Sequence, residues 1–132
     1  MARDGLERPI VPIWVETGHG KRALIDALVD MGSDVTLFPL SLNDDLRIDL
    51  SGVAETPVGS PLGPAATYRA YSLFLELRRP SDVFRWRTPV GFVPRLMSYG
   101  ILGTRGCFEY FNVRYHASEH WLEIEPAGLL PQ

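Results

Sequence analysis

At 132 residues, the chain has the length of one domain, and we expect a single domain over residues 1–132. Because 45% of the residues are apolar, it should fold around a core, and a net charge of −3 without a basic stripe argues against nucleic-acid binding. Cys107 is the only cysteine, so no intrachain disulfide can form. The charged N-terminus lacks the apolar core of a signal peptide, and no apolar stretch is long enough to span a bilayer. We therefore expect a cytoplasmic protein without nucleic-acid or membrane partners.

The first half of the chain is predicted to form short strands separated by turns. Eleven prolines and twelve glycines disfavour long helices. The strands expected in this half are 9–16, 22–30 and 33–39. The segment TGHGK at 17–21 supplies the glycines that a hairpin turn needs, and Gly32 marks a tight break before the third strand. The segment SLNDDL at 41–46 starts with a serine that can cap a helix, which predicts a single helical turn.

The second half is predicted to contain an exposed loop, longer strands and one short helix. Residues 54–66 are rich in Gly, Pro and Ala, which is typical of a long exposed loop. The strands expected here are 67–77, 82–93, a short apolar piece at 98–103 and a closing hairpin at 112–126. In the strand 82–93, Phe84 and Trp86 alternate with arginines, the period-2 pattern of a half-buried strand. With a short helix near residues 104–110, the chain should be a mostly-β domain of the barrel or sandwich type.

Three features follow one another along the chain. An Asp-Met-Gly motif at 30–32 ends an apolar strand within ALVDMGSDVTLFP, a Gly/Pro-rich loop follows, and an Ile-Leu-Gly motif at 101–103 stands within YGILGTRGCFEYFNVRY. This order resembles the retropepsin-like (retroviral-type) aspartic proteases, especially their bacterial single-domain relatives, over about residues 9–126. In that family a strand ends in Asp-Thr/Ser-Gly, a flap hairpin follows, and an apolar-apolar-Gly motif packs beside the active-site loop. The resemblance implies a single-lobe acid-protease barrel.

The resemblance also implies which residues form the site. The catalytic residue would be Asp30, and the active-site loop would also contain Met31, Gly32, Ser33 and Asp34. The structural motif beside this loop would be Ile101, Leu102 and Gly103. The glycines Gly59 and Gly63 would mark either a flap tip or an ordinary surface loop. Hydrolysis of this kind uses no metal ion and no cofactor, and we expect neither.

Peptide hydrolysis by carboxylates requires two of them. One acts as a base that activates water, and the other acts as an acid that protonates the leaving nitrogen. Two carboxylates about 3 Å apart cannot both be charged, so they share one proton. This chain has one Asp-x-Gly at the end of an apolar strand, so a pair requires Asp30 from each of two subunits. We therefore expect a homodimer that binds an extended peptide beneath its flaps.

The neighbours of Asp30 have expected roles. Gly32 should permit a tight turn that brings backbone N–H groups to the carboxylate, and Ser33 should donate its hydroxyl to an Asp30 oxygen. In the family, the aspartate at the position of Asp34 helps to hold the substrate backbone and often pairs with an arginine after the apolar-apolar-Gly motif. Here the arginine stands one position further along, at Arg105, so this ion pair is left open.

Met31 is the departure from the family pattern. The family has Thr or Ser there, whose hydroxyl ties the two active-site loops together across the dimer, whereas methionine has no donor. Met31 either weakens the dimer and its activity, packs against its symmetry mate as an apolar plug, or silences the enzyme. Three hypotheses stay open: an aspartic endopeptidase, an inactive dimer of the same fold that binds peptide or acts as a scaffold, and an unrelated small β-barrel.

Other residues have plainer interpretations. Asp30 by itself is also compatible with a turn aspartate at a strand end. Cys107 is expected to be a small buried apolar residue and not a reactive thiol. His116 and His120 flank a predicted turn, but no third ligand accompanies them, so no metal site is predicted.

Overall fold

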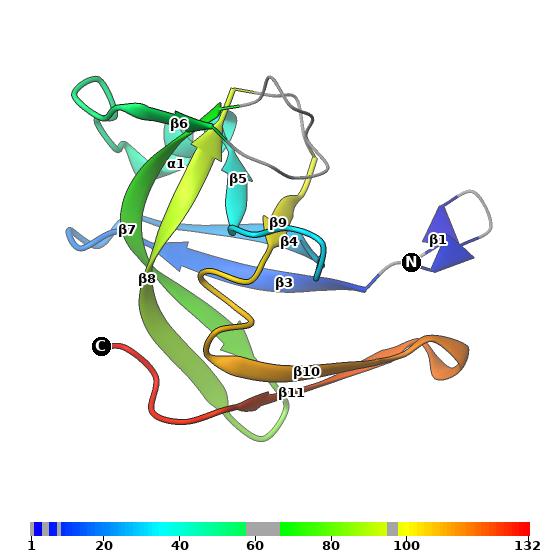
Figure 1. Cartoon of the computed structure of the whole chain (residues 1–132). Helices are drawn as coiled ribbons and strands as arrows, with labels where there is room; N and C mark the ends of the chain where they lie inside the picture. Colours follow the sequence, from blue (N-terminus) through cyan, green and yellow to red (C-terminus); the bar gives the residue numbers. More distant parts are fainter. Residues whose placement is uncertain (1, 4–5, 8, 58–66, 95–97) are drawn as a thin grey trace.

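A barrel of curved strands carries a separate hairpin at its C-terminal end (Figure 1). The computed structural model describes residues 2–3, 6–7, 9–57, 67–94 and 98–132. The strands of the main sheet are β3 (Ile10–Glu16), β4 (Arg22–Val29), β5 (Leu37–Pro39), β6 (Glu55–Pro57), β7 (Thr67–Arg78), β8 (Val83–Val93) and β9 (Gly100–Leu102). The other elements are β1 (Ala2–Arg3), β2 (Leu6–Glu7), η1 (Leu40–Leu42), α1 (Asn43–Leu46), β10 (Phe111–His116), η2 (Ala117–Glu119) and β11 (Trp121–Pro126). Within the described part of the chain, every helix is too short to cross a membrane.

The main sheet closes on itself. Its strands follow the order β3, β4, β9, β5, β8 and β7, and β7 pairs back to β3, while β6 extends the sheet beside β7. The pairs β4–β9 and β5–β8 are parallel, and the remaining pairs are antiparallel. Closure of the ring satisfies backbone groups that an open sheet would leave at its edges. As a result β9 lies between β4 and β5, the two strands that flank the Asp30 segment.

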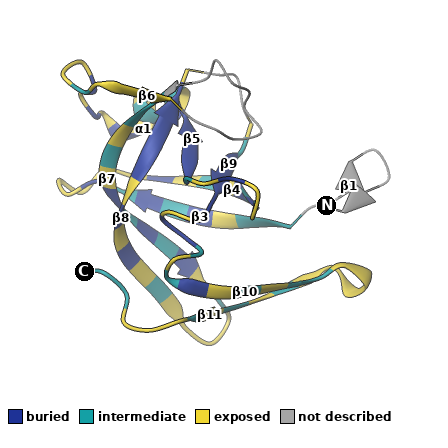
Figure 2. Cartoon of the chain, viewed as in Figure 1, coloured by how far each residue is buried: buried dark blue, intermediate teal, exposed yellow. Residues whose placement is uncertain are grey.

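The core fills the inside of this barrel, and the buried residues alternate along the strands (Figure 2). In β8 the side chains of Trp86 and Thr88 are buried while Arg85 and Arg87 are exposed, which confirms the predicted period-2 pattern. The indole Nε1–H of Trp86 donates to the carbonyl oxygen of Gly106 at 2.7 Å, so its one polar group is paired inside the core. The mostly-β barrel predicted from the sequence is confirmed.

The hairpin of β10 and β11 is a two-stranded sheet of its own. Because such a hairpin is marginal by itself, it needs an apolar face to pack on the barrel. Val113, Leu122 and Ile124 supply that face and pack against the core. On the opposite face the ring of His116 stacks on Trp121 at 3.8 Å between centroids. The closing hairpin predicted at 112–126 is confirmed.

The short helix predicted near 104–110 is wrong, because these residues form successive turns. The backbone N–H groups of Thr104 and Arg105 donate to Ser33 and Asp34 in another part of the chain. Gly106 then has φ +97°, a left-handed conformation that a helix does not accept. The helical residues of the barrel lie instead at 40–46, where the sequence predicted a helical turn.

Two further boundaries differ from the sequence-based prediction. The strand expected at 33–39 is reduced to β5, because residues 33–36 bond to the segment after β9 instead of continuing the ladder. The loop expected at 54–66 begins with β6, which pairs with the start of β7. Residues 58–66, with Gly59 and Gly63, lie outside the described residues.

Replacing Trp86 with Phe should destabilise the fold because the Gly106 carbonyl loses its buried donor. We expect the free energy of unfolding to fall by about 1–3 kcal/mol, measured by urea denaturation followed by circular dichroism. Trp121→Phe is the matched control, since Trp121 is 42% exposed, and it should change stability by about 0.5 kcal/mol or less. Equal losses in the two variants would contradict the role given to the indole.

Cys107 should be unreactive in the folded chain. Its side chain is buried, and burial raises the pKa of the thiol from 9.0 to about 12. Between pH 9.0 and about 12 the thiol is ionised mainly in the unfolded chain. The stability that its protonated form gives to the fold is therefore complete below pH 9.0 and is lost as the pH rises through about 12. A thiol reagent at about pH 8 should label Cys107 only after the chain is unfolded in urea. Equal labelling rates with and without urea would show that the thiol is accessible.

Candidate active site

Asp30 stands directly after β4 and is held by backbone groups on both sides. Its N–H donates to the carbonyl oxygen of Leu102 at 3.0 Å, which fixes it to the end of β9. Its carboxylate Oδ1 accepts the N–H of Gly32 at 2.9 Å, and its carbonyl accepts the N–H of Ser33 at 3.2 Å. A Cβ on Gly32 would lie 3.2 Å from Oδ1, so glycine leaves room for this turn. The predicted approach of a backbone N–H to the carboxylate is confirmed.

The Ile-Leu-Gly motif lies directly against the Asp30 loop. Ile101 and Leu102 are buried in β9, next to β4 and β5. At Gly103 a Cβ would come within 2.2 Å of the Val35 carbonyl oxygen and 2.7 Å of the Ser33 carbonyl oxygen. Because backbone atoms cannot move aside as a side chain can, this position accepts only glycine. The structure thus brings together two motifs that are far apart in the sequence.

Thr36 is a site residue that the sequence reasoning did not identify. Its buried hydroxyl accepts the N–H of Gly103 at 3.1 Å, and its own N–H donates to the carbonyl of Arg105 at 3.0 Å. Its carbonyl also accepts the N–H of Gly91 from β8 at 2.8 Å. Thr36 therefore joins the Asp30 loop, the segment after β9 and the neighbouring strand. The available signal was a hydroxyl residue within the apolar run VTLFP, since a buried polar group needs a partner.

The role predicted for the Ser33 hydroxyl is wrong. The Ser33 side chain is fully buried, and its Oγ–H donates to the carbonyl oxygen of Val35 at 2.7 Å. A hydroxyl carries one hydrogen, so this bond leaves none for Asp30. Ser33 therefore shapes the loop from inside and does not touch the carboxylate.

Asp34 and Arg105 meet through their backbones and not through their charges. The N–H of Arg105 donates to the carbonyl of Asp34 at 3.0 Å. Among the ion pairs of the described residues, none joins these two exposed side chains. Arg105 stands one position further along than the arginine of the family pattern. Its backbone still contacts the Asp34 segment, but its side chain does not pair with the Asp34 carboxylate.

Met31 projects from the tip of the loop with 63% of its surface exposed. It borders a hollow of about 340 Å³ whose other walls are Thr104, Phe108, Phe111, Asn112 and Val113. This hollow lies between the turns after β9 and the start of β10. Neither flap glycine can be placed against it, since Gly59 and Gly63 are outside the described residues.

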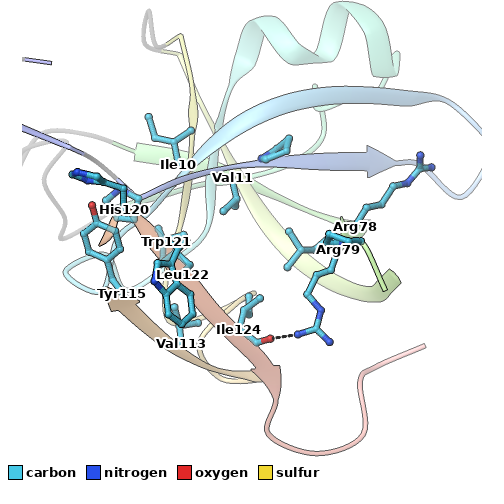
Figure 3. A pocket seen from close by; sticks show the side chains of 15 residues that line it. Ile10, Val11, Arg78, Arg79, Val113, Tyr115, His120, Trp121, Leu122 and Ile124 are labelled. Atoms are coloured by element: carbon cyan, nitrogen blue, oxygen red, sulfur yellow. Dashed lines mark hydrogen bonds between the residues drawn. The ribbon is translucent and has the colours of Figure 1, made fainter. Parts of the chain in front are cut away.

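A second hollow of about 370 Å³ separates β3 from the β10–β11 hairpin (Figure 3). Its walls are mainly apolar and include Ile10, Leu122 and Ile124, while Arg79 at its rim donates to the Ile124 carbonyl and to Glu125. Val29, the residue before Asp30, also lines it, but none of the predicted catalytic side chains does. In the part of the chain that the structure describes, no three His, Cys, Asp or Glu side chains are grouped to hold a metal ion.

Solved structures of similar fold include a retropepsin-like aspartic protease from Rickettsia conorii. It is 13% identical, with a TM-score of 0.55, over 94% of this chain and 95% of that chain. The chain has a retropepsin-like fold. The EIAV protease complexed with the inhibitor HBY-793 is also similar, at 14% identity and a TM-score of 0.47, over 78% of this chain and 88% of that chain. No protein-family model matches the sequence, and no curated protein matches it.

Removing the Thr36 hydroxyl should loosen the site of this retropepsin-like fold. Thr36→Val keeps the side-chain shape but leaves the Gly103 N–H without its acceptor, so we expect a loss of about 1–3 kcal/mol in unfolding free energy. Thr36→Ser keeps the hydroxyl and should lose about 1 kcal/mol or less, the value of one buried methyl group. Chemical denaturation measures both, and faster hydrogen exchange at the Gly103 amide should accompany Thr36→Val alone. A Thr36→Val protein as stable as Thr36→Ser would refute the hydroxyl's role.

Proposed function

We propose that the chain is an aspartic endopeptidase that acts as a homodimer. The observation that carries this proposal is the position of Asp30, whose backbone is bonded to Leu102 and whose carboxylate is oriented by Gly32 within a retropepsin-like fold. The bond to Leu102 fixes the backbone of the loop against β9, and the Gly32 N–H orients the carboxylate. Both suit the positioning that catalysis requires.

The proposed chemistry uses two Asp30 carboxylates, one from each subunit. When two carboxylates face each other, one holds a proton and the other is charged. The charged group removes a proton from water, which attacks the peptide carbonyl, while the protonated group gives its proton to the carbonyl oxygen. When the C–N bond breaks, the first group passes the proton that it took from water to the leaving nitrogen, and the second recovers its own proton from the diol. The chain supplies one such aspartate, so the reaction depends on a two-fold dimer.

The proposed substrate is a peptide in extended form. Main-chain hydrogen bonds from the enzyme would hold it, and pockets for alternate side chains would select it. The exposed Asp34 stands four residues after Asp30 in the same loop and has no ion-pair partner in Arg105, so its carboxylate is available to accept a substrate N–H. The strands β6 and β7 form the paired arms of a hairpin from which a flap would extend.

A second candidate function is a dimer of the same fold that binds peptide without cleaving it. The observation that favours it is Met31, which places an exposed thioether where the family has a hydroxyl. Without that hydroxyl, one side-chain hydrogen bond per subunit is absent from the region of the carboxylate pair, a loss of about 0.5–1.5 kcal/mol each.

Cleavage of a peptide library by the purified chain tests the proposal, over about pH 3 to 7 where carboxylate pairs change protonation. Asp30→Asn should lower kcat/KM by about 10²–10⁴-fold, because it removes the acid and base together. Asp26→Asn is the matched control, since it changes an aspartate within β4, outside the loop, and this variant should cleave peptides at the unchanged rate.

Three outcomes of this assay are informative. If the Asp30→Asn variant still cleaves the peptide library, the carboxylate mechanism is excluded. An increase in cleavage confined to Met31→Thr would identify the chain as a weakened enzyme, whereas peptide binding without cleavage in all variants would favour the non-catalytic dimer.

A further inference from the structure

Met31 is exposed at a place that a carboxylate pair brings against a second subunit. Consecutive Cα atoms are about 3.8 Å apart, and the two Asp30 carboxylates need to approach to about 3 Å. Met31 therefore cannot avoid contact with the partner if the dimer of the proposed function forms, and the inference below rests on that proposed function. In the single chain Met31 is 63% exposed, so most of its surface is free to pack on a partner.

The hollow beside Met31 combines polar and apolar walls. Phe108 and Val113 are partly buried and offer it aromatic and aliphatic surface, while Phe111 is almost fully buried. Thr104 and Asn112 stand at its polar, exposed rim. Its volume is about 340 Å³, which leaves room for an added side chain. If two subunits meet at Asp30, a hollow left unfilled at their contact would lose packing energy.

We propose that each Met31 enters the hollow of the other subunit, so that two reciprocal thioether contacts replace the hydroxyl tie between the active-site loops. A two-fold axis makes the contact self-complementary, since Met31 of one chain meets the hollow of its partner and the reverse. Methionine suits the task because its unbranched side chain fills irregular gaps and its sulfur packs favourably at aromatic edges, here that of Phe108. The occupant is thus a second copy of this chain, and the carboxylate pair is assembled by apolar packing.

Sedimentation equilibrium of the full chain tests the Met31 contact, because it measures the Kd of the dimer. Met31→Ala should raise Kd by about tenfold or more, because each dimer loses two buried side chains. Met31→Leu conserves the side-chain volume, so its dimer Kd should stay within about threefold of the value for the unchanged chain. Asn112→Arg places a charged side chain at the rim of the hollow and should also raise Kd. Both positions are exposed in the single chain, so the melting temperature of the monomer should stay unchanged in all three variants.

Peroxide oxidation gives a second measurement that needs no variant. Hydrogen peroxide transfers one oxygen atom to the Met31 sulfur, which forms the sulfoxide and leaves water. Peptide mass spectrometry should show slower oxidation of Met31 at protein concentrations above Kd than below it. The oxidised chain should dimerise more weakly, because the sulfoxide is polar.

The outcomes distinguish this inference from the proposed function. A dimer whose Kd is the same in Met31→Ala, or a monomer at all concentrations, would overturn the inference, whatever the cleavage assay shows. A dimer that depends on Met31 but cleaves no peptide supports the inference and overturns the endopeptidase. Cleavage that depends on Asp30 in a dimer indifferent to Met31 supports the enzyme and overturns the Met31 contact.

Discussion

The closeness of Gly103 to the loop between β4 and β5 is the constraint on which the candidate site depends. A side chain at this position would collide with the carbonyl oxygens of Val35 and Ser33. Because glycine removes that collision, the backbones of 103–105 and 33–36 bond to each other directly, and the Thr36 hydroxyl accepts the Gly103 N–H. These hydrogen bonds hold residues 33–36 in place against the barrel, although they form no regular secondary structure.

This contact also divides the Asp30 loop into an inner and an outer part. Ser33 and Thr36 point inward, where their hydroxyls are buried and paired, so they stabilise the loop instead of acting on a substrate. Met31 and Asp34 point outward and have few contacts within the chain. A rigid inner part with an exposed outer part is suited to hold one carboxylate in place and to present its neighbours to a partner or a peptide. The proposed dimer and the proposed chemistry therefore rest on the same few residues.

Much of the barrel could be predicted from local pattern. The alternation in β8 and the glycine turn between β3 and β4 have local causes, and both were predicted. The pairing of the Asp-Met-Gly and Ile-Leu-Gly motifs came from the family resemblance, since no local rule joins segments about 70 residues apart. The helix expected near 104–110 failed because Gly106 takes a left-handed conformation, with φ +97°, in the middle of that segment.

The sequence by itself determined a β-rich chain with one Asp-x-Gly at a strand end, which is the basis of the proposed two-carboxylate centre. It also determined that a thioether replaces the family's hydroxyl at Met31. Only the tertiary structure decided that Ser33 turns away from Asp30, that Thr36 joins the two motifs, and that Met31 stands beside a hollow. The physical reason is that hydroxyl and N–H groups bond to whichever partners the fold brings near. For Ser33 that partner is Val35 in the same loop, and for Thr36 it is Gly103 after β9.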